Sequence, residues 1–207
     1  MLLRSTSVVR RRDNSRVNFI SYGSVVAKNN VPEKVAFVVA KLEEAGVVVL
    51  GETTVAEWNS NNLEHDVGAL LGGSGAALGA NFAELAVGED TGGSIQVPSS
   101  FCSLVRIRVT PGLISRIGSC PLIKVQDTAG PMARTVTDCA LMLDCMVGFD
   151  PGNDFTGFAA TAAAIGLPRG GSYAAHLEDR PSKIKKAKIK KAKIGIVRHR
   201  FGPDSDP

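Results

Sequence analysis

The segment GEDTGGSI at residues 88–95 combines glycines with a serine in a way that suits nucleophilic chemistry. Gly92 and Gly93 stand immediately before Ser94, and glycines let the backbone turn tightly and direct several N–H groups to one point. Converging N–H groups stabilise the negative oxygen that forms when a carbonyl carbon is attacked. The spacing therefore predicts Ser94 as a nucleophile on a turn that also forms an oxyanion hole.

A serine nucleophile needs a group that takes its proton, and the residues alone leave this group open. The three histidines, His65, His176 and His199, lie far apart in polar, loop-like contexts, which does not favour a Ser-His-Asp triad. A lysine-type base is the alternative. Because no G-K-[ST] follows the glycines, the segment is not a Walker phosphate-binding loop.

Helical and extended patterns alternate along the chain, and this alternation predicts an α/β fold. Apolar periodicity and small residues predict helices at 35–45, 76–81 and 137–146. Short apolar runs predict strands at 47–50, 85–87 and 193–201. Thr137 or Asp138 is expected to cap the third helix.

The charge of the chain is concentrated near its end. There are 24 Lys and Arg against 20 Asp and Glu, and residues 183–200 hold nine of the basic side chains and no acidic one. This segment includes the repeated pentad KIKKA, which we interpret as a solvated linker. We expect no nucleic-acid partner, because no aromatic residue is interleaved with the lysines as in an RNA-binding patch. Binding to RNA or an anionic membrane is the alternative.

Several classes of protein are excluded by composition and pattern. In 207 residues no apolar stretch approaches the length of a membrane span, and residues 1–14 lack the apolar core of a secretory signal. The four cysteines are scattered, so we expect no zinc site, no disulfide framework and no cofactor. The sequence predicts a cytoplasmic protein, and it leaves the oligomeric state open.

Three longer segments resemble the amidase signature family. They are EKVAFVVAKLEEAGVVVLGETTVAEW at 33–58, GEDTGGSIQVPSSFC at 88–102 and QDTAGPMARTVTD at 126–138. The resemblance covers residues 31–150 well and the flanks faintly. It implies a partial amidase-signature fold, with a mixed β-sheet flanked by helices.

The resemblance also implies an activity, the hydrolysis of small-molecule carboxylic amides through a Ser–Ser–Lys triad and an acyl-enzyme. Ser94 matches the nucleophile, and Asp90 and Asp127 fall on acidic positions within the family's core. The N–H groups matching the oxyanion hole are those of Thr91, Gly92, Gly93 and Ser94.

Two positions depart from the family pattern. Leu70 stands where the family has its relay serine, held by a cis peptide bond, and Arg12 stands at the position of the lysine base. Leucine has no proton to transfer, and arginine keeps its proton at any working pH. Ser74 would replace the relay only with an insertion inside a helix that fits without one. The alternative function is therefore a catalytically inactive remnant or a partner-binding pseudoenzyme.

The same comparison with the family predicts four regions. They are a degenerate N-terminal segment (1–30), the amidase-signature core (31–150), a loop-rich segment (151–182) and a Lys-rich linker with a strand (183–207). Because the family's domain is longer than this chain, we expect the domain to be truncated, as in a fragment.

Overall fold

The computed structural model describes the central part of the chain most fully. The described residues are 2–4, 25–26, 29–30, 35–53, 72–154, 156–157 and 171–178, with residues 2–4 described by their backbone alone. The predicted linker at 183–200 and the strand at 193–201 lie outside these residues. No helix in the described ranges has the length and apolar character needed to cross a bilayer.

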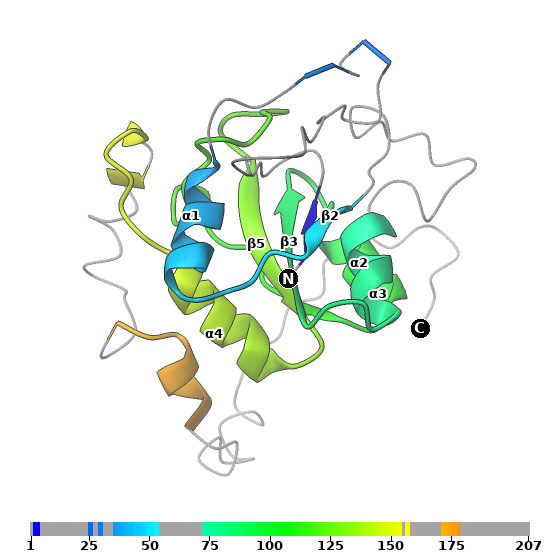
Figure 1. The fold of residues 1–207 in the computed structure, drawn as a ribbon. Helices are drawn as coiled ribbons and strands as arrows, with labels where there is room; N and C mark the ends of the chain where they lie inside the picture. The colour runs from blue at the N-terminus through cyan, green and yellow to red at the C-terminus, as the bar shows by residue number, and fades with distance from the viewer. Residues whose placement is uncertain are drawn as a thin grey trace, which may run out of the picture.

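A five-stranded mixed sheet forms the centre of the structure (Figure 1). Its strands are β1 (Leu2–Arg4), β2 (Gly51–Thr53), β3 (Leu85–Asp90), β4 (Val105–Arg106) and β5 (Thr128–Ala133). Their order across the sheet is β2-β1-β3-β5-β4. β1 is parallel to both β2 and β3, whereas β5 is antiparallel to both β3 and β4. The mixed sheet that the sequence predicts is therefore confirmed.

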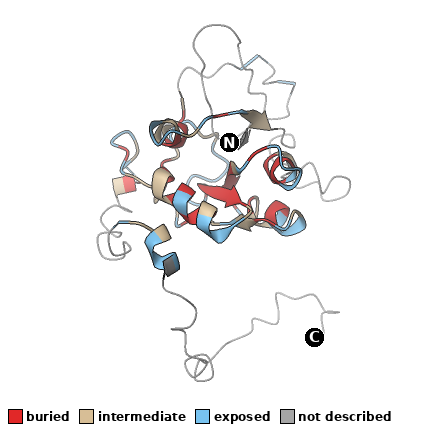
Figure 2. Cartoon of the chain, turned by 60° about the horizontal axis from the view of Figure 1, so that its bottom comes forward, coloured by how far each residue is buried: buried red, intermediate tan, exposed pale blue. Residues whose placement is uncertain are grey.

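Helices cover both faces of this sheet. They are α1 (Phe37–Glu44), α2 (Gly72–Gly79), α3 (Gln96–Phe101) and α4 (Val136–Met146), followed by the 3-10 helix η2 (Ala174–Glu178). α1 and α4 lie on one side of β3 and β5, and α2 and α3 lie on the other (Figure 1). Alternate side chains of a strand point to opposite faces, so Val87 packs with α1 and α4 while Ala86 packs near α2. The buried residues gather between these layers (Figure 2).

Three predictions about secondary structure need correction. The strand expected at 47–50 is wrong, because Gly46 ends α1 with φ of +86° and the Val47 N–H still bonds to the Leu42 carbonyl. The strand begins at Gly51 instead. The cap of α4 is Thr135, whose Oγ1 accepts the Asp138 N–H at 3.1 Å, so Thr137 and Asp138 are not the cap. The third is the helix expected at 76–81, which begins at Gly72 and ends at Gly79. The structure also contains elements that we did not predict, among them the strand β1 and the helix α3.

Two glycines face each other across the sheet at the point where the chain approaches the predicted site. Gly88 on β3 is the register partner of Gly130 on β5. The fully buried Ile95 side chain lies over this pair: a Cβ atom at Gly88 would be 2.7 Å from Ile95 Cγ1, and one at Gly130 would be 3.0 Å from Ile95 Cδ1. We call this space the glycine notch. It exists because neither residue has a side chain.

We predict that Gly130→Ala destabilises the protein by roughly 2–4 kcal/mol, because overpacking against backbone cannot be relieved by a rotamer change. The new Cβ would stand 2.3 Å from the Ile107 carbonyl oxygen. Urea unfolding followed by circular dichroism measures the loss. Gly51→Ala is the matched control, since a Cβ there meets nothing within 4 Å. Equal midpoints for Gly130→Ala and the parent chain would contradict the packing described.

Burial raises the pKa of Glu52, on β2, from 4.5 to about 7. Its Oε1 atom is buried and has no hydrogen-bond partner among the described residues. Since the folded chain holds this proton to higher pH than the unfolded chain, unfolding free energy should fall between pH 4.5 and 7 and then level off. Because the side chain is only half-buried, screening limits the effect to on the order of 1 kcal/mol.

We predict that Glu52→Gln removes this fall, so that the variant gains stability relative to the parent as pH rises from 4.5 to 7. Chemical unfolding at a series of pH values measures the difference. Glu44→Gln, at an exposed position of α1, is the control and should leave the pH profile unchanged. A parent and a Glu52 variant with parallel profiles would refute the raised pKa.

Candidate active site

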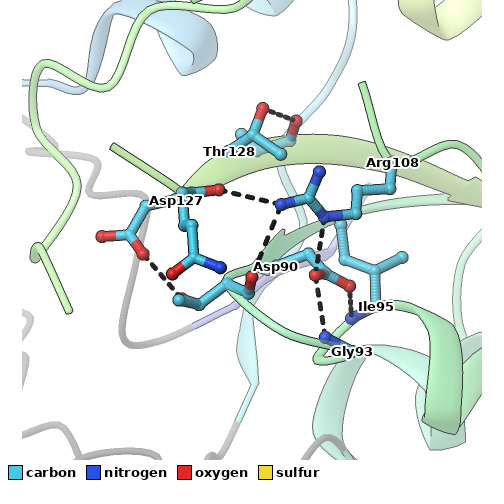
Figure 3. A network of polar contacts seen from close by, with 9 residues as sticks. Asp90, Gly93, Ile95, Arg108, Asp127 and Thr128 are labelled. Carbon is cyan, nitrogen blue, oxygen red and sulfur yellow. Dashed lines mark hydrogen bonds and ion pairs between the residues drawn. The ribbon is translucent and has the colours of Figure 1, made fainter. Parts of the chain in front are cut away.

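The turn that carries Ser94 is wrapped around a buried carboxylate. Asp90 ends β3 and is fully buried, and its Oδ1 accepts the Gly93 N–H at 2.9 Å while its Oδ2 accepts the Ile95 N–H at 2.9 Å (Figure 3). The residues on both sides of Ser94 are thus fixed to one side chain. Gly93 has φ of +132°, a backbone conformation that L side chains rarely adopt, which explains the glycine before the serine.

Arg108 supplies the positive charge beside Asp90. Its Nε donates to Asp90 Oδ1 at 3.0 Å, and its Nη2 donates to the Gln126 carbonyl at 3.0 Å and to the Thr91 carbonyl at 3.4 Å (Figure 3). A buried carboxylate is costly unless it is paired and hydrogen-bonded. This guanidinium and the two turn N–H groups meet that requirement.

A second buried carboxylate holds the other end of the turn. Asp127 Oδ1 accepts the Thr91 hydroxyl at 2.6 Å, and the same carboxylate accepts the N–H groups of Leu122 and Ile123 at 2.8 to 3.0 Å. Asp127 thereby ties residues 122–127 to the turn. The prediction that Asp90 and Asp127 are acidic residues of the core is confirmed, since their relative exposures are 0% and 1%.

This arrangement leaves Ser94 partly exposed. Ser94 is half-buried and Gly92 is exposed. Within the described residues, the Ser94 hydroxyl and the N–H groups of Gly92 and Ser94 make no hydrogen bond. Of the four N–H groups predicted for an oxyanion hole, that of Gly93 is engaged by Asp90, whereas those of Gly92 and Ser94 have no acceptor among the described residues.

The hydrogen bonds of Ser74 go to residues other than Ser94. Ser74 lies on α2 with 3% of its surface exposed, shares a hydrogen bond with Thr53 Oγ1 at 3.1 Å and donates to the Val87 carbonyl at 3.4 Å. These contacts join α2 to the sheet. Arg12 and Leu70, predicted at the base and relay positions, lie outside the described residues, so their roles stay predictions.

A pocket of about 190 Å³ borders Asp127, the carboxylate that holds Thr91 in the turn. It is lined by Glu89, Arg116, Ile117, Ser119, Pro121, Lys124, Asp127 and Asn153. Two acidic and two basic side chains give it a mixed charge. Since Asp127 also holds Thr91, the pocket lies against the side of the turn, and Ser94 is not among its lining residues.

Comparison with known proteins shows which family the chain resembles. Residues 18–207 match the family described as Amidase. The chain belongs to the amidase family. Its match begins after Arg12, and it includes the whole of the site described above.

Relatives of this amidase-family chain include curated and solved proteins. A glutamyl-tRNA(Gln) amidotransferase subunit from Gloeothece citriformis is 34% identical over 200 residues, which cover 89% of this chain and 38% of the relative. A solved amidase family protein from Bacillus anthracis is 31% identical with a TM-score of 0.65, covering 77% of this chain and 35% of that one. The peptide amidase of Stenotrophomonas maltophilia is 32% identical with a TM-score of 0.63, covering 75% and 35%. The chain thus spans little more than a third of these relatives.

The sequence did not reveal every residue that builds the site. Arg108 was not predicted, although the alternation of Arg106, Ile107 and Arg108 beside a strand indicates that both arginines lie on the face opposite Ile107. The role of Ile95 and the glycine notch was also missed. The notch depends on the pairing of β3 with β5, which a single segment of sequence does not show.

We predict that Asp90→Asn destabilises the protein by about 3 kcal/mol, because an amide cannot accept from both N–H groups and from Arg108, and its NH₂ would face a donor. The free energy of unfolding in urea measures this. Asp154→Asn, at an exposed position, is the control. An Asp90 variant as stable as the parent would show that the carboxylate does not hold the turn.

Proposed function

We propose that this amidase-family chain hydrolyses carboxylic amides with Ser94 as the nucleophile. The observation that carries the proposal is the position of Ser94 between two residues, Gly93 and Ile95, whose N–H groups are fixed to the buried Asp90. The accessible hydroxyl and the available N–H groups beside it are the arrangement that acyl transfer requires.

In the proposed reaction, Ser94 Oγ forms a bond to the amide carbonyl carbon, and the carbonyl oxygen takes the negative charge. The N–H groups of Gly92 and Ser94 then donate to this oxygen. The amine leaves with a proton, and water hydrolyses the resulting ester to the acid and the free serine. The Thr91 N–H is also among the groups predicted for the oxyanion hole. The Thr91 side chain is held by its hydrogen bond to Asp127.

The removal of the Ser94 proton is the slow part of this reaction. Leu70 and Arg12 stand at the family's relay and base positions, and neither side chain accepts a proton at neutral pH. Removing the activating partners of a nucleophile lowers the rate by orders of magnitude. We therefore expect acylation that is slow compared with that of a chain carrying serine and lysine at these positions.

The substrate class is supported by the names of the relatives. One name denotes part of an amidotransferase and the other denotes a peptide amidase, so both describe chemistry at an amide. We extend to this chain this shared chemistry at an amide, and a small-molecule carboxylic amide as the substrate stays our prediction from the sequence. Because the first relative is named as one component of a larger assembly, protein partners belong to the hypothesis.

We predict that a fluorophosphonate probe labels the purified chain slowly at Ser94, because the N–H groups of Gly92 and Ser94 would stabilise the phosphoryl oxygen while no relay or base accelerates the attack. Mass spectrometry of the modified peptide locates the label. Ser94→Ala should abolish labelling, whereas Ser100→Ala, at an exposed position of α3, should leave it unchanged.

The double variant Arg12→Lys with Leu70→Ser extends this test. It restores a relay and a base at the family positions, so labelling of Ser94 should accelerate at least about tenfold. Absence of labelling in both the parent and the double variant would contradict Ser94 as a nucleophile.

A further inference from the structure

We propose that Arg108 is a positioning residue that fixes the orientation of the Thr91–Gly92 peptide group and, through it, the direction of the Gly92 N–H. This inference rests on the proposed function, in which that N–H donates to the substrate's carbonyl oxygen. The inference explains why the Gly92 N–H points in one direction: Arg108 holds the carbonyl of the same peptide group.

The guanidinium of Arg108 contacts two separate segments at once. Nε donates to Asp90 Oδ1 at 3.0 Å, and Nη2 donates to the carbonyl oxygens of Gln126 at 3.0 Å and Thr91 at 3.4 Å (Figure 3). A planar group with three acceptors around it has little freedom to rotate. The Thr91 carbonyl is therefore directed toward a guanidinium that is itself held in place.

The geometry of the peptide bond converts this contact into a direction for Gly92. In a trans peptide the C=O and the N–H point in opposite directions, and the described residues contain no cis peptide bond. Since the Thr91 oxygen points toward Arg108, the Gly92 N–H points away from it. A reversed peptide would turn its N–H toward the positive charge, which disfavours that orientation.

Packing does not hold the Gly92 end of this peptide. Gly92 is exposed, and a Cβ atom at this position would meet nothing within 4 Å. Gly92 and Gly93 also permit backbone conformations that other residues do not, so a reversed peptide has few steric barriers. Asp127 holds the Thr91 side chain and Asp90 holds the next N–H groups, whereas among the described residues it is Arg108 that contacts the Thr91 carbonyl.

The test compares the full chain with Arg108→Met, Arg108→Lys and the control Arg106→Met, an exposed arginine two residues earlier. The second-order rate of fluorophosphonate labelling at Ser94 should fall about 100-fold in Arg108→Met, which is the usual effect of losing one oxyanion donor. Arg108→Lys should recover part of this loss, because an ammonium keeps the charge but not the three contacts. Arg106→Met should stay within about twofold of the parent.

Steady-state kinetics on an aryl amide separate positioning from general loss of structure. The hydrogen bond of Gly92 strengthens as charge develops on the carbonyl oxygen, so the loss in Arg108→Met should fall on kcat with KM nearly unchanged. Circular dichroism melting checks that the variant is folded. Labelling of folded Arg108→Met at the parent rate, or a loss confined to KM, would overturn the inference.

Crystal structures of the parent and of Arg108→Met test the inference without relying on catalytic activity, because they show the orientation of the Thr91–Gly92 peptide group directly. If the parent chain leaves Ser94 unlabelled, the proposed function fails, and the orientation of the Thr91–Gly92 peptide is still measurable. A carbonyl that turns away from position 108 in the variant is the expected result. A peptide with the same orientation in both structures would refute the role of Arg108.

Discussion

The buried carboxylate of Asp90 is the constraint on which the geometry of the site depends. An anion with no exposed surface must find donors, and those it finds are two N–H groups of its own turn and the guanidinium of Arg108. The backbone therefore curls around Asp90, with Ser94 between the two bonded residues. Ser94 lies where it does because the residues on both sides of it donate hydrogen bonds to the buried Asp90 carboxylate.

The sheet contributes the second constraint, which acts on the end of the turn that leads into α3. Ile95 is fixed by its N–H to Asp90 and by its side chain in the glycine notch between Gly88 and Gly130. The same side chain belongs to the apolar cluster formed with Leu78 and Met132. The turn is thus attached through Ile95 to the apolar core between the sheet and α2.

Local patterns allowed part of this to be predicted, and long-range pairing accounts for the remainder. The turn at 88–95 and the acidic residues Asp90 and Asp127 were predicted because the determining residues are close in sequence and carry the family resemblance. Arg108 was not, because its contact with Asp90 joins residues 18 positions apart and depends on the register of β4 beside β5. The strand expected at 47–50 was misplaced because apolar character does not show which residues find a partner strand. Arg12 and Leu70 remain predictions from the family pattern.

The anchors of the turn all come from one stretch of chain, between Gly88 and Gly130, and this has an evolutionary consequence. Arg12 and Leu70, which stand at the base and relay positions of the family pattern, both precede this stretch. The hydrogen bonds and the glycine notch that fix the turn are all formed by residues of this stretch, so substitutions before it can accumulate while these contacts are kept. A lineage that substitutes residues outside this stretch can therefore keep the shape of the turn, which is then available for a later change of chemistry.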